Sequence, residues 1–140
     1  MDSFTQSDLV EVRRDARKGR GARGVFARHL IRKNTLMERV PVLLIPKHEV
    51  FGKSKAAQRA CRISWYVFGW GIQEGHDYVA VALGYGSLYN HSYKPNATIR
   101  LISPDILEVE AIIDIIEGEE ITINYNGDPS DNAPVNFLVQ

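Results

Sequence analysis

Short apolar runs separated by turn-forming residues dominate the hydrophobic pattern of this chain. The runs are rich in β-branched and aromatic residues, and clusters of Gly, Pro, Asn or Lys separate them, which is typical of short β-strands. The predicted strands cover residues 9–14, 24–27, 35–40, 42–46, 62–70, 78–83, 98–103, 106–115 and 119–125. So many short strands predict a compact β-rich fold in one piece.

Helical signals are few in comparison. Residues 48–60 form the best helix candidate, although Gly52 weakens it. A Pro-Asp pair lies between the strands predicted at 98–103 and 106–115 and indicates a hairpin. The tail from residue 126 has little regular pattern until Phe137. We therefore expect 48–60 to be the main helix of a mostly β protein.

The composition is that of an ordinary globular chain. Its 140 residues are 44% hydrophobic and 24% charged, which suits one domain with a core that needs no metal or disulfide. No apolar run approaches the ~20 residues that cross a membrane, and no signal-peptide segment is evident. Cys61 is the single cysteine, which excludes an intramolecular disulfide and a cysteine-rich zinc site. We expect a cytosolic or nuclear protein that is not secreted and holds no metal.

Charge is distributed unevenly although the net charge is zero. Residues 1–33 carry nine basic and four acidic side chains, whereas residues 101–140 carry nine acidic side chains and no Lys or Arg. The acidic end could attract a basic peptide, and the basic end a phosphate or carboxylate. Solvated surface at both ends is the simpler explanation of charge runs alone.

The loop LYNHSYKPNA, at residues 88–97, is the first candidate for a site. Asn90 and His91 offer hydrogen-bond donors and acceptors. Pro95 favours an extended approach of the preceding residue, and Asn96 suits a turn capped through its own backbone. No orienting carboxylate for serine-histidine catalysis is locally evident. Taken alone, the Asn-His pair is better explained as a hydrogen-bonded turn.

Two further segments stand out, far from this loop in the sequence. KGRGARGVFA, at residues 18–27, has glycines that would let a ligand approach the backbone. It lacks the Gly-Lys-Ser/Thr ending of a P-loop and opens no helix, so it fits neither a P-loop nor a dinucleotide-binding turn. By itself it is better explained as a hairpin turn. GEEITINYN, at residues 118–126, ends its strand at Tyr125, where an aromatic residue commonly keeps a wet hydroxyl.

Taken in order, the three segments resemble the signature of the SET-domain protein lysine methyltransferases. The matching stretches are RGVFA, NHSYKPN and GEEITINY, and the resemblance spans about residues 9–127. The small size and the sequence ALGYGSLYNHS are similar to the minimal single-domain SET proteins of viruses and bacteria. The resemblance implies one SET domain over residues 1–140, with a tail at 128–140. Its mostly β (β-clip) fold would have several small sheets, a knot-like C-terminal crossing and one or two short helices.

The resemblance also implies a cofactor and the roles of individual residues. SET proteins bind S-adenosylmethionine through backbone groups of the glycine-rich turn and through the Asn-His pair. Asn90 would bond the amino-acid end of the donor, His91 would add backbone contacts, and Tyr125 matches the catalytic tyrosine. The cofactor-binding positions implied here are Ala22, Arg23, Gly24, Asn90, His91 and Phe137, and the positions implied to be architectural are Ser92, Pro95 and Asn96.

Physical chemistry is consistent with these roles. Methyl transfer from a sulfonium needs a neutral amine, and a lysine with its ordinary pKa of about 10.4 must first lose a proton. An apolar channel beside the positive sulfur disfavours the ammonium form. The enzyme then chiefly holds the amine and the methyl group in line. The Tyr125 hydroxyl can orient the amine or polarise the methyl group without being a strong base.

The sequence departs from the family pattern at several positions. Family members usually have Gly where Ala22 stands and an aromatic residue where Arg23 stands. The alanine is small enough to be tolerated, and the arginine could meet the donor's carboxylate. Ile123 occupies a position that often tunes the number of methyl groups added, so mono-, di- and trimethylation all remain open. The substrate channel would include Ile123 and Tyr66, although core packing explains Tyr66 equally well. Phe137 would pack over the donor or the channel in place of an absent cysteine-rich segment.

The functional prediction is therefore an S-adenosylmethionine-dependent protein-lysine methyltransferase acting on a histone or another basic protein. The alternative is a catalytically silent SET module that binds a protein partner, because a fold does not determine a function. We expect a lysine-containing basic protein or peptide as partner, no membrane and no direct nucleic acid binding, and a homodimer remains open. The prediction requires Gly24 and Asn90 to lie on one face of the molecule.

Overall fold

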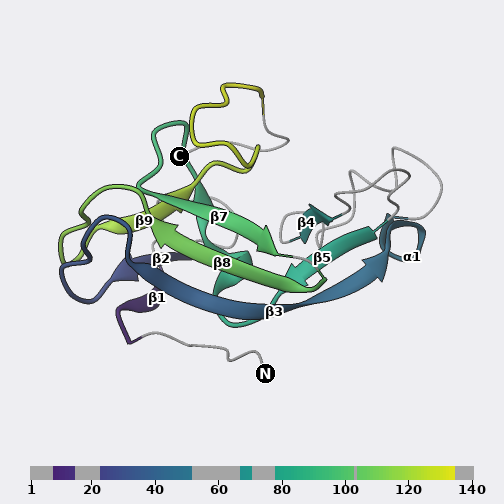
Figure 1. Ribbon diagram of the computed structural model, residues 1–140, viewed down its shortest axis with the longest axis horizontal. Coiled ribbons are helices and arrows are strands. Elements are labelled where there is room, and N and C mark those ends of the chain that lie inside the picture. The colour runs from purple at the N-terminus through teal and green to yellow at the C-terminus, as the bar shows by residue number, and fades with distance from the viewer. Residues whose placement is uncertain (1–7, 15–22, 52–66, 71–77, 103, 135–140) are drawn as a thin grey trace.

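The structure is a computed structural model that describes residues 8–14, 23–51, 67–70, 78–102 and 104–134. These residues form a five-stranded antiparallel sheet and a four-stranded mixed sheet (Figure 1). The five-stranded sheet has the order β4 (Val67–Trp70), β5 (Tyr78–Ala82), β3 (Leu36–Pro46), β8 (Ile106–Ala111) and β7 (Ala97–Ile102). The four-stranded sheet has the order β1 (Val10–Arg14), β2 (Arg23–Ala27), β9 (Glu120–Ile123) and β6 (Asn90–His91). The expectation of a mostly β fold with several sheets is confirmed.

The long strand β3 organises the five-stranded sheet and corrects a sequence prediction. We expected separate strands at 35–40 and 42–46, with Pro41 between them, but β3 runs without interruption from Leu36 to Pro46. Its first half pairs with β8 up to Pro41, and its second half pairs with β5 from Val42 onward. Pro41 lies where the partner strand changes, so its missing N–H interrupts neither ladder.

The hairpin predicted around the Pro-Asp pair is confirmed by β7 and β8, which pair antiparallel from Ala97↔Ala111 to Ile102↔Ile106. The strand predicted at 106–115 is nevertheless too long, because β8 ends at Ala111. The apolar run continues beyond it, but Ile113 is exposed and Asp114 accepts a hydrogen bond from the Lys33 backbone. The apolar run therefore extends beyond the end of β8 and did not indicate where the strand ends.

The four-stranded sheet joins segments that are distant in sequence. β1 and β2 form an antiparallel pair, β9 pairs antiparallel with β2, and β6 pairs parallel with β9. In Figure 1 this sheet lies at one end of β3, and β4, β5 and α1 (Lys47–Phe51) lie at the other end. β9 thus runs between the glycine-rich segment and the Asn-His segment, as the predicted convergence requires.

The main core fills the space between the two sheets. β2 and β9 contribute Val25, Ile121 and Ile123, which are fully buried, and β8 contributes the inward-facing Leu107 and Val109. The alternation of buried and partly exposed positions along β8 and β9 is that of strands with one face on the core. Because β9 packs inward through its isoleucines, its other side chains are held firmly beside β2 and β6.

Part of the predicted helix and of one predicted strand lies outside the described residues. α1 covers Lys47–Phe51, near the start of the helix predicted at 48–60, and β4 covers the end of the strand predicted at 62–70. A second helical element is the short 3₁₀ turn η3 (Gly86–Leu88), just before β6. No helix in the described part of the chain combines the length and the apolar character of a membrane span.

Candidate functional site

The site begins at Gly24 in β2, where three strands approach one another closely. A Cβ atom built on Gly24 would lie 2.3 Å from Glu120 Oε2 of β9 and 3.0 Å from Asn90 Nδ2 of β6. Any other residue would force at least the Glu120 carboxylate to move. The prediction that Gly24 and Asn90 share one face is therefore confirmed, and the glycine is explained by the close approach of its neighbours.

Asn90 connects the two neighbouring strands through its side-chain amide. The Nδ2 group donates one hydrogen bond to the Arg23 carbonyl at 2.8 Å and one to Glu120 Oε2 at 2.7 Å. These acceptors fix the orientation of the amide, because only the NH₂ end can donate to both. The amide oxygen is consequently an acceptor that no hydrogen bond among the described residues uses.

Tyr125 follows β9 and is held against the segment that leads into β6. Its hydroxyl donates a hydrogen bond to the carbonyl oxygen of Tyr89 at 2.6 Å. Its backbone N–H donates to Nδ1 of His91 at 2.9 Å, and the two rings lie 5.1 Å apart. Since Tyr89 directly precedes Asn90, the Tyr125 hydroxyl bonds the backbone one residue before the asparagine.

His91 is buried, and its protonation state is determined by its contacts. Nδ1 accepts a hydrogen bond from the Tyr125 backbone, so the neutral ring carries its proton on Nε2. Burial lowers the pKa of His91 below its ordinary value of 6.5, which favours this neutral form. Its side chain also contacts the Tyr93 ring edge-on at 4.4 Å. The His91 side chain therefore locks the loop to the segment after β9.

Two of the three residues expected to be architectural, Asn96 and Ser92, make hydrogen bonds around the site. Asn96 Oδ1 accepts from the backbone N–H of Thr122, and its Nδ2 donates to the Glu120 carbonyl, both at 2.8 Å. The expectation that Asn96 caps a turn through its own backbone is therefore wrong, because its side chain forms hydrogen bonds with the backbone of β9 instead. The Ser92 hydroxyl accepts from the Lys94 backbone at 3.0 Å and closes a small turn.

The sequence analysis missed three residues that complete this region. Glu120 contacts Asn90, and Asn124 donates to the backbone carbonyl of Asp131 at 2.6 Å, which anchors the segment after β9. Tyr89 supplies the carbonyl that accepts the hydrogen bond from the Tyr125 hydroxyl. All three lie within or next to the recognised motifs. The only sequence signal for them was that proximity, because their partners lie in other segments.

Three predicted site residues, Ala22, Tyr66 and Phe137, lie outside the described residues. Ile123, predicted to line the substrate channel, is fully buried in the main core. Its contribution to a channel stays a prediction. Arg23 is half-buried, and its backbone carbonyl is the acceptor for Asn90.

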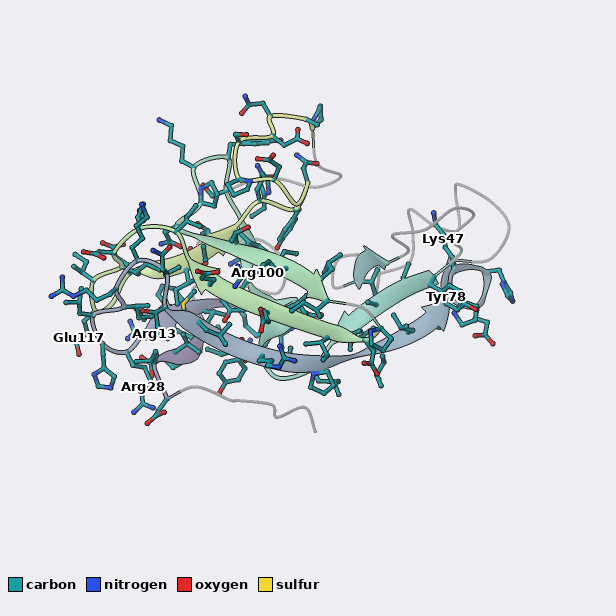
Figure 2. The ribbon with its side chains drawn as sticks, in the orientation of Figure 1. Arg13, Arg28, Lys47, Tyr78, Arg100 and Glu117 are labelled. Carbon is teal, nitrogen blue, oxygen red and sulfur yellow. The ribbon has the colours of Figure 1, made fainter. Side chains whose placement is uncertain are left out.

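The surface around the site carries charges of both signs. Figure 2 shows Arg13, Arg28 and Glu117 around the end of the molecule that contains the four-stranded sheet, with Lys47 and Tyr78 at the opposite end. Part of the acidic C-terminal third is neutralised within the five-stranded sheet, because Glu108 pairs with Arg39 and Glu110 with Arg100. The described residues contain no cluster of three or more His, Cys, Asp or Glu side chains that could hold a metal ion.

Another acidic group lies in the segment after β9, close to Tyr125 in sequence. Asp128 is exposed and accepts hydrogen bonds from the backbone and hydroxyl of Ser130, which lower the pKa of its carboxyl group. Asp131 accepts from the Ala133 backbone at 2.8 Å. Negative charge therefore persists near the end of β9 even where the sheet itself is neutralised.

Solved structures with the same architecture include a candidate methyltransferase. This is a Plasmodium falciparum protein described as a candidate histone methyltransferase, with 28% identity, a TM-score of 0.61, and coverage of 86% of this chain and 95% of that chain. A humanized mutant of the Polycomb Repressive Complex 2 of Chaetomium thermophilum, bound to an inhibitor, matches at 18% identity and a TM-score of 0.61. The same complex bound to S-adenosylmethionine matches at 21% identity and a TM-score of 0.60.

The two Polycomb matches cover 85% of this chain but only 15% of the much longer chains they come from, and at these identities they show the fold alone. No curated protein matches the sequence. The sequence does match the family model of the SET domain over residues 22–126, which include β2, β6 and β9 and all of the contacts described above for Gly24, Asn90 and Tyr125. The chain belongs to the SET-domain family.

Proposed function

We propose that the protein is a protein-lysine N-methyltransferase that uses S-adenosylmethionine as its methyl donor. The observation that carries this proposal is the continuity between Asn90 and Tyr125. Asn90 holds its amide nitrogen beside the glycine of β2, and the carbonyl of the preceding residue, Tyr89, accepts a hydrogen bond from the Tyr125 hydroxyl. A donor site and a hydroxyl suited to positioning an amine are thereby joined through two adjacent residues.

The residues present fit the polar end of the donor. The missing side chain at Gly24 lets the Glu120 carboxylate and the Asn90 amide approach the backbone of β2, because a Cβ would overlap their positions. The Asn90 amide oxygen can accept a hydrogen bond from an ammonium group, and the Glu120 carboxylate that orients Asn90 adds negative charge on the same side. Arg23 and His91 would contribute backbone groups, together with Ala22 and Phe137. When bound, the donor supplies an electrophilic methyl group on a sulfonium.

The chain itself contributes positioning of the amine. The Tyr125 hydroxyl donates a hydrogen bond to the Tyr89 carbonyl, and a hydroxyl oxygen that donates can also accept a hydrogen bond from an amine N–H. Accepting an amine N–H orients the nitrogen lone pair, and orientation of this kind lowers the barrier without a strong base. A neutral amine is also favoured by the apolar surroundings that Ile123 and Tyr66 would provide.

The proposed substrate is a lysine side chain in a basic protein such as a histone, in the cytoplasm or the nucleus. The exposed carboxylate of Asp128 and the neighbouring Asp131 follow Tyr125 closely in the chain, so a positively charged segment would be attracted to this side of the site. The similarity to a candidate histone methyltransferase at 28% identity supports the same substrate class. A homodimer stays a prediction.

The test is transfer of a labelled methyl group from S-adenosylmethionine to a mixture of basic proteins, with the modified residue identified by mass spectrometry. We expect labelled lysine, and a loss of about 10²–10³-fold in turnover for Tyr125→Phe, because a lost positioning hydrogen bond at a reacting centre has that size. Tyr78→Phe is the matched control, since Tyr78 is exposed at the far end of the molecule (Figure 2). No transfer to any basic protein, with donor binding absent too, would favour the silent SET module instead.

A further inference from the structure

A buried acid, Glu38, lies outside the residues that the proposed reaction uses. Its side chain is fully buried although it belongs to β3 of the five-stranded sheet. The register between β3 and β8 shifts between Leu36 and Glu38, so β3 carries a bulge there. Met37 and Glu38 are consequently both buried, whereas a regular strand would turn one of them outward. The bulge explains how a carboxylate comes to face the interior.

The Glu38 carboxylate anchors both ends of one short segment. Oε2 accepts the backbone N–H of Tyr85 at 3.1 Å, and Oε1 accepts the hydroxyl of Tyr89 at 2.6 Å. The backbone just before this segment also approaches the acid closely, because a Cβ on Gly84 would lie 2.9 Å from Glu38 Oε2. One carboxylate thus determines the position of residues 85–89, including the turn η3.

Tyr89 connects this anchored segment to the proposed active site. Its hydroxyl donates to Glu38, and its backbone carbonyl accepts the hydroxyl of Tyr125 at 2.6 Å. Tyr89 is itself buried, so its ring has little freedom to move. A continuous series of contacts therefore leads from the buried acid, through Tyr89, to the hydroxyl that we place in the reaction.

We propose that Glu38 is a positioning residue for methyl transfer, which holds Tyr89 so that its carbonyl fixes the Tyr125 hydroxyl. This inference rests on the proposed function for the role it gives Tyr125. The residues that carry it are Glu38, Tyr89 and Tyr125, which come from β3, from the segment before β6 and from the end of β9.

The electrostatics suit a structural tether rather than a proton-transfer group. Burial raises the pKa of Glu38 above its ordinary value. Burial and the adjacent Glu38 raise the pKa of Tyr89 well above 10, so the Tyr89 hydroxyl keeps its proton and remains a donor. Burying an acid costs free energy unless its oxygens are bonded. Here both oxygens have partners, and both partners lie in the segment that leads to the site.

The first experiment measures the Tyr125 hydroxyl without requiring activity. The protein is labelled with fluorotyrosine, and the Tyr125 fluorine resonance is assigned by its disappearance in Tyr125→Phe. Tyr89→Phe removes the bond to Glu38 but keeps the Tyr89 ring and carbonyl, so we expect the Tyr125 resonance to move. Glu38→Gln, which cannot accept both original hydrogen bonds, should move it as well. The matched control Tyr78→Phe should leave it in place. An unchanged Tyr125 resonance in Tyr89→Phe would overturn the inference.

The second experiment is a double-mutant cycle on turnover. Tyr89→Phe should lower kcat by about tenfold with the donor dissociation constant nearly unchanged, which corresponds to a loss of about 1.4 kcal/mol in the transition state. In a Tyr125→Phe background the same substitution should change kcat by less than about twofold, because its effect acts through the removed hydroxyl. An equal loss in both backgrounds would show that Tyr89 acts by another route and would contradict the proposal.

The two readouts separate the inference from the function it rests on. If the wild-type protein transfers no methyl group, the proposed function fails, and the fluorine resonance still decides whether Glu38 and Tyr89 position Tyr125. If Glu38→Gln does not fold, Tyr89→Phe tests the same contact from the other side. The wild type could transfer methyl groups while the Tyr125 fluorine resonance stays unchanged in Tyr89→Phe. That result would support the proposed function and refute the inference.

Discussion

The β7–β8 pair of the five-stranded sheet and the strand pairs around β9 in the four-stranded sheet are stabilised by different kinds of contact. β7 and β8 pair along six residues of each strand, and Arg100 and Glu110 add an ion pair across them. In the four-stranded sheet, β6 and β9 share two residue pairs, as do β2 and β9. Asn90 adds side-chain hydrogen bonds to Arg23 and Glu120, and Asn96, just before β7, bonds the backbone of β9.

The difference indicates where single substitutions should matter. A ladder of backbone hydrogen bonds survives the loss of one surface side chain, because the backbone continues to pair. A short strand pair that depends on one amide loses several hydrogen bonds when that amide is removed. The site therefore occupies the part of the fold in which individual side chains determine the geometry, and the five-stranded sheet serves as its support.

Among the substitutions that compare the two sheets, the largest effect is expected for Gly24→Ala. Its Cβ would collide with Glu120 Oε2 and displace the carboxylate that orients Asn90. Loss of a hydrogen bond to a charged group is worth about 1.5–3 kcal/mol, so the donor dissociation constant should rise by about tenfold or more. Isothermal titration with S-adenosylmethionine measures it.

The matched control for this substitution is Gly118→Ala. Gly118 has a φ of 88° in open space, so an alanine there is strained without touching the site. It should lower the free energy of unfolding by about 1 kcal/mol and leave donor affinity unchanged. Equal donor affinities for Gly24→Ala and the wild type would refute the close approach of β2, β6 and β9 as the basis of the site.

A second prediction compares the two sheets directly through Asn96→Ala and Arg100→Ala. Removing Asn96 leaves the Thr122 N–H and the Glu120 carbonyl without their partners, at a cost of about 1–3 kcal/mol in the free energy of unfolding. Removing the half-exposed Arg100 breaks ion pairs with Glu108 and Glu110 at a cost of about 0–1 kcal/mol. Urea unfolding of both variants measures the difference. If Arg100→Ala costs as much as Asn96→Ala, the distinction between the sheets is wrong.

The smallest expected effect is a pH dependence contributed by His91. Its folded pKa lies below 6.5, so between these two values the unfolded chain binds a proton that the folded protein does not bind. The stability provided by neutral His91 is therefore complete above about pH 6.5 and is lost as the pH falls through the folded pKa. Protonation would also break the bond from the Tyr125 N–H to Nδ1.

His91→Asn tests this contribution, because the asparagine oxygen can replace Nδ1 as acceptor but does not titrate. The difference in the free energy of unfolding between the wild type and the variant should shrink, or change sign, as the pH falls from neutrality toward 5. Urea unfolding at a series of pH values measures it. Parallel curves for the two proteins over this range would show that His91 makes no such contribution.

Most of the regular structure could be predicted from the sequence because alternation and turn residues report local geometry. The β7–β8 hairpin follows from two β-rich runs around a Pro-Asp pair. The continuity of β3 could not be predicted. A proline interrupts a strand only where the ladder needs an N–H donor from that residue, and here the partner strand changes at Pro41. The end of β8 was missed because Ile113 continues the apolar run while facing solvent.

The site could be predicted as three motifs that converge, but not as a set of contacts. Glycine, Asn-His and tyrosine motifs identified Gly24, Asn90 and Tyr125, and the structure brings them together. The partners Glu120 and Glu38 were not predicted. Each of them reaches a residue far away in the sequence through a side chain, and no periodic pattern encodes such a pairing.

The most direct test of the account is the affinity for S-adenosylmethionine of Asn90→Ala and Tyr125→Phe, measured by isothermal titration beside the wild type. The account predicts that Asn90→Ala weakens donor binding by about tenfold or more, whereas Tyr125→Phe binds the donor like the wild type. Asn126→Ala, which removes an amide that bonds the Ala133 carbonyl in the exposed tail, is the matched control and should bind normally. Wild-type donor affinity in Asn90→Ala, or no donor binding by the wild type itself, would contradict the central claim that these strands form a methyl-donor site.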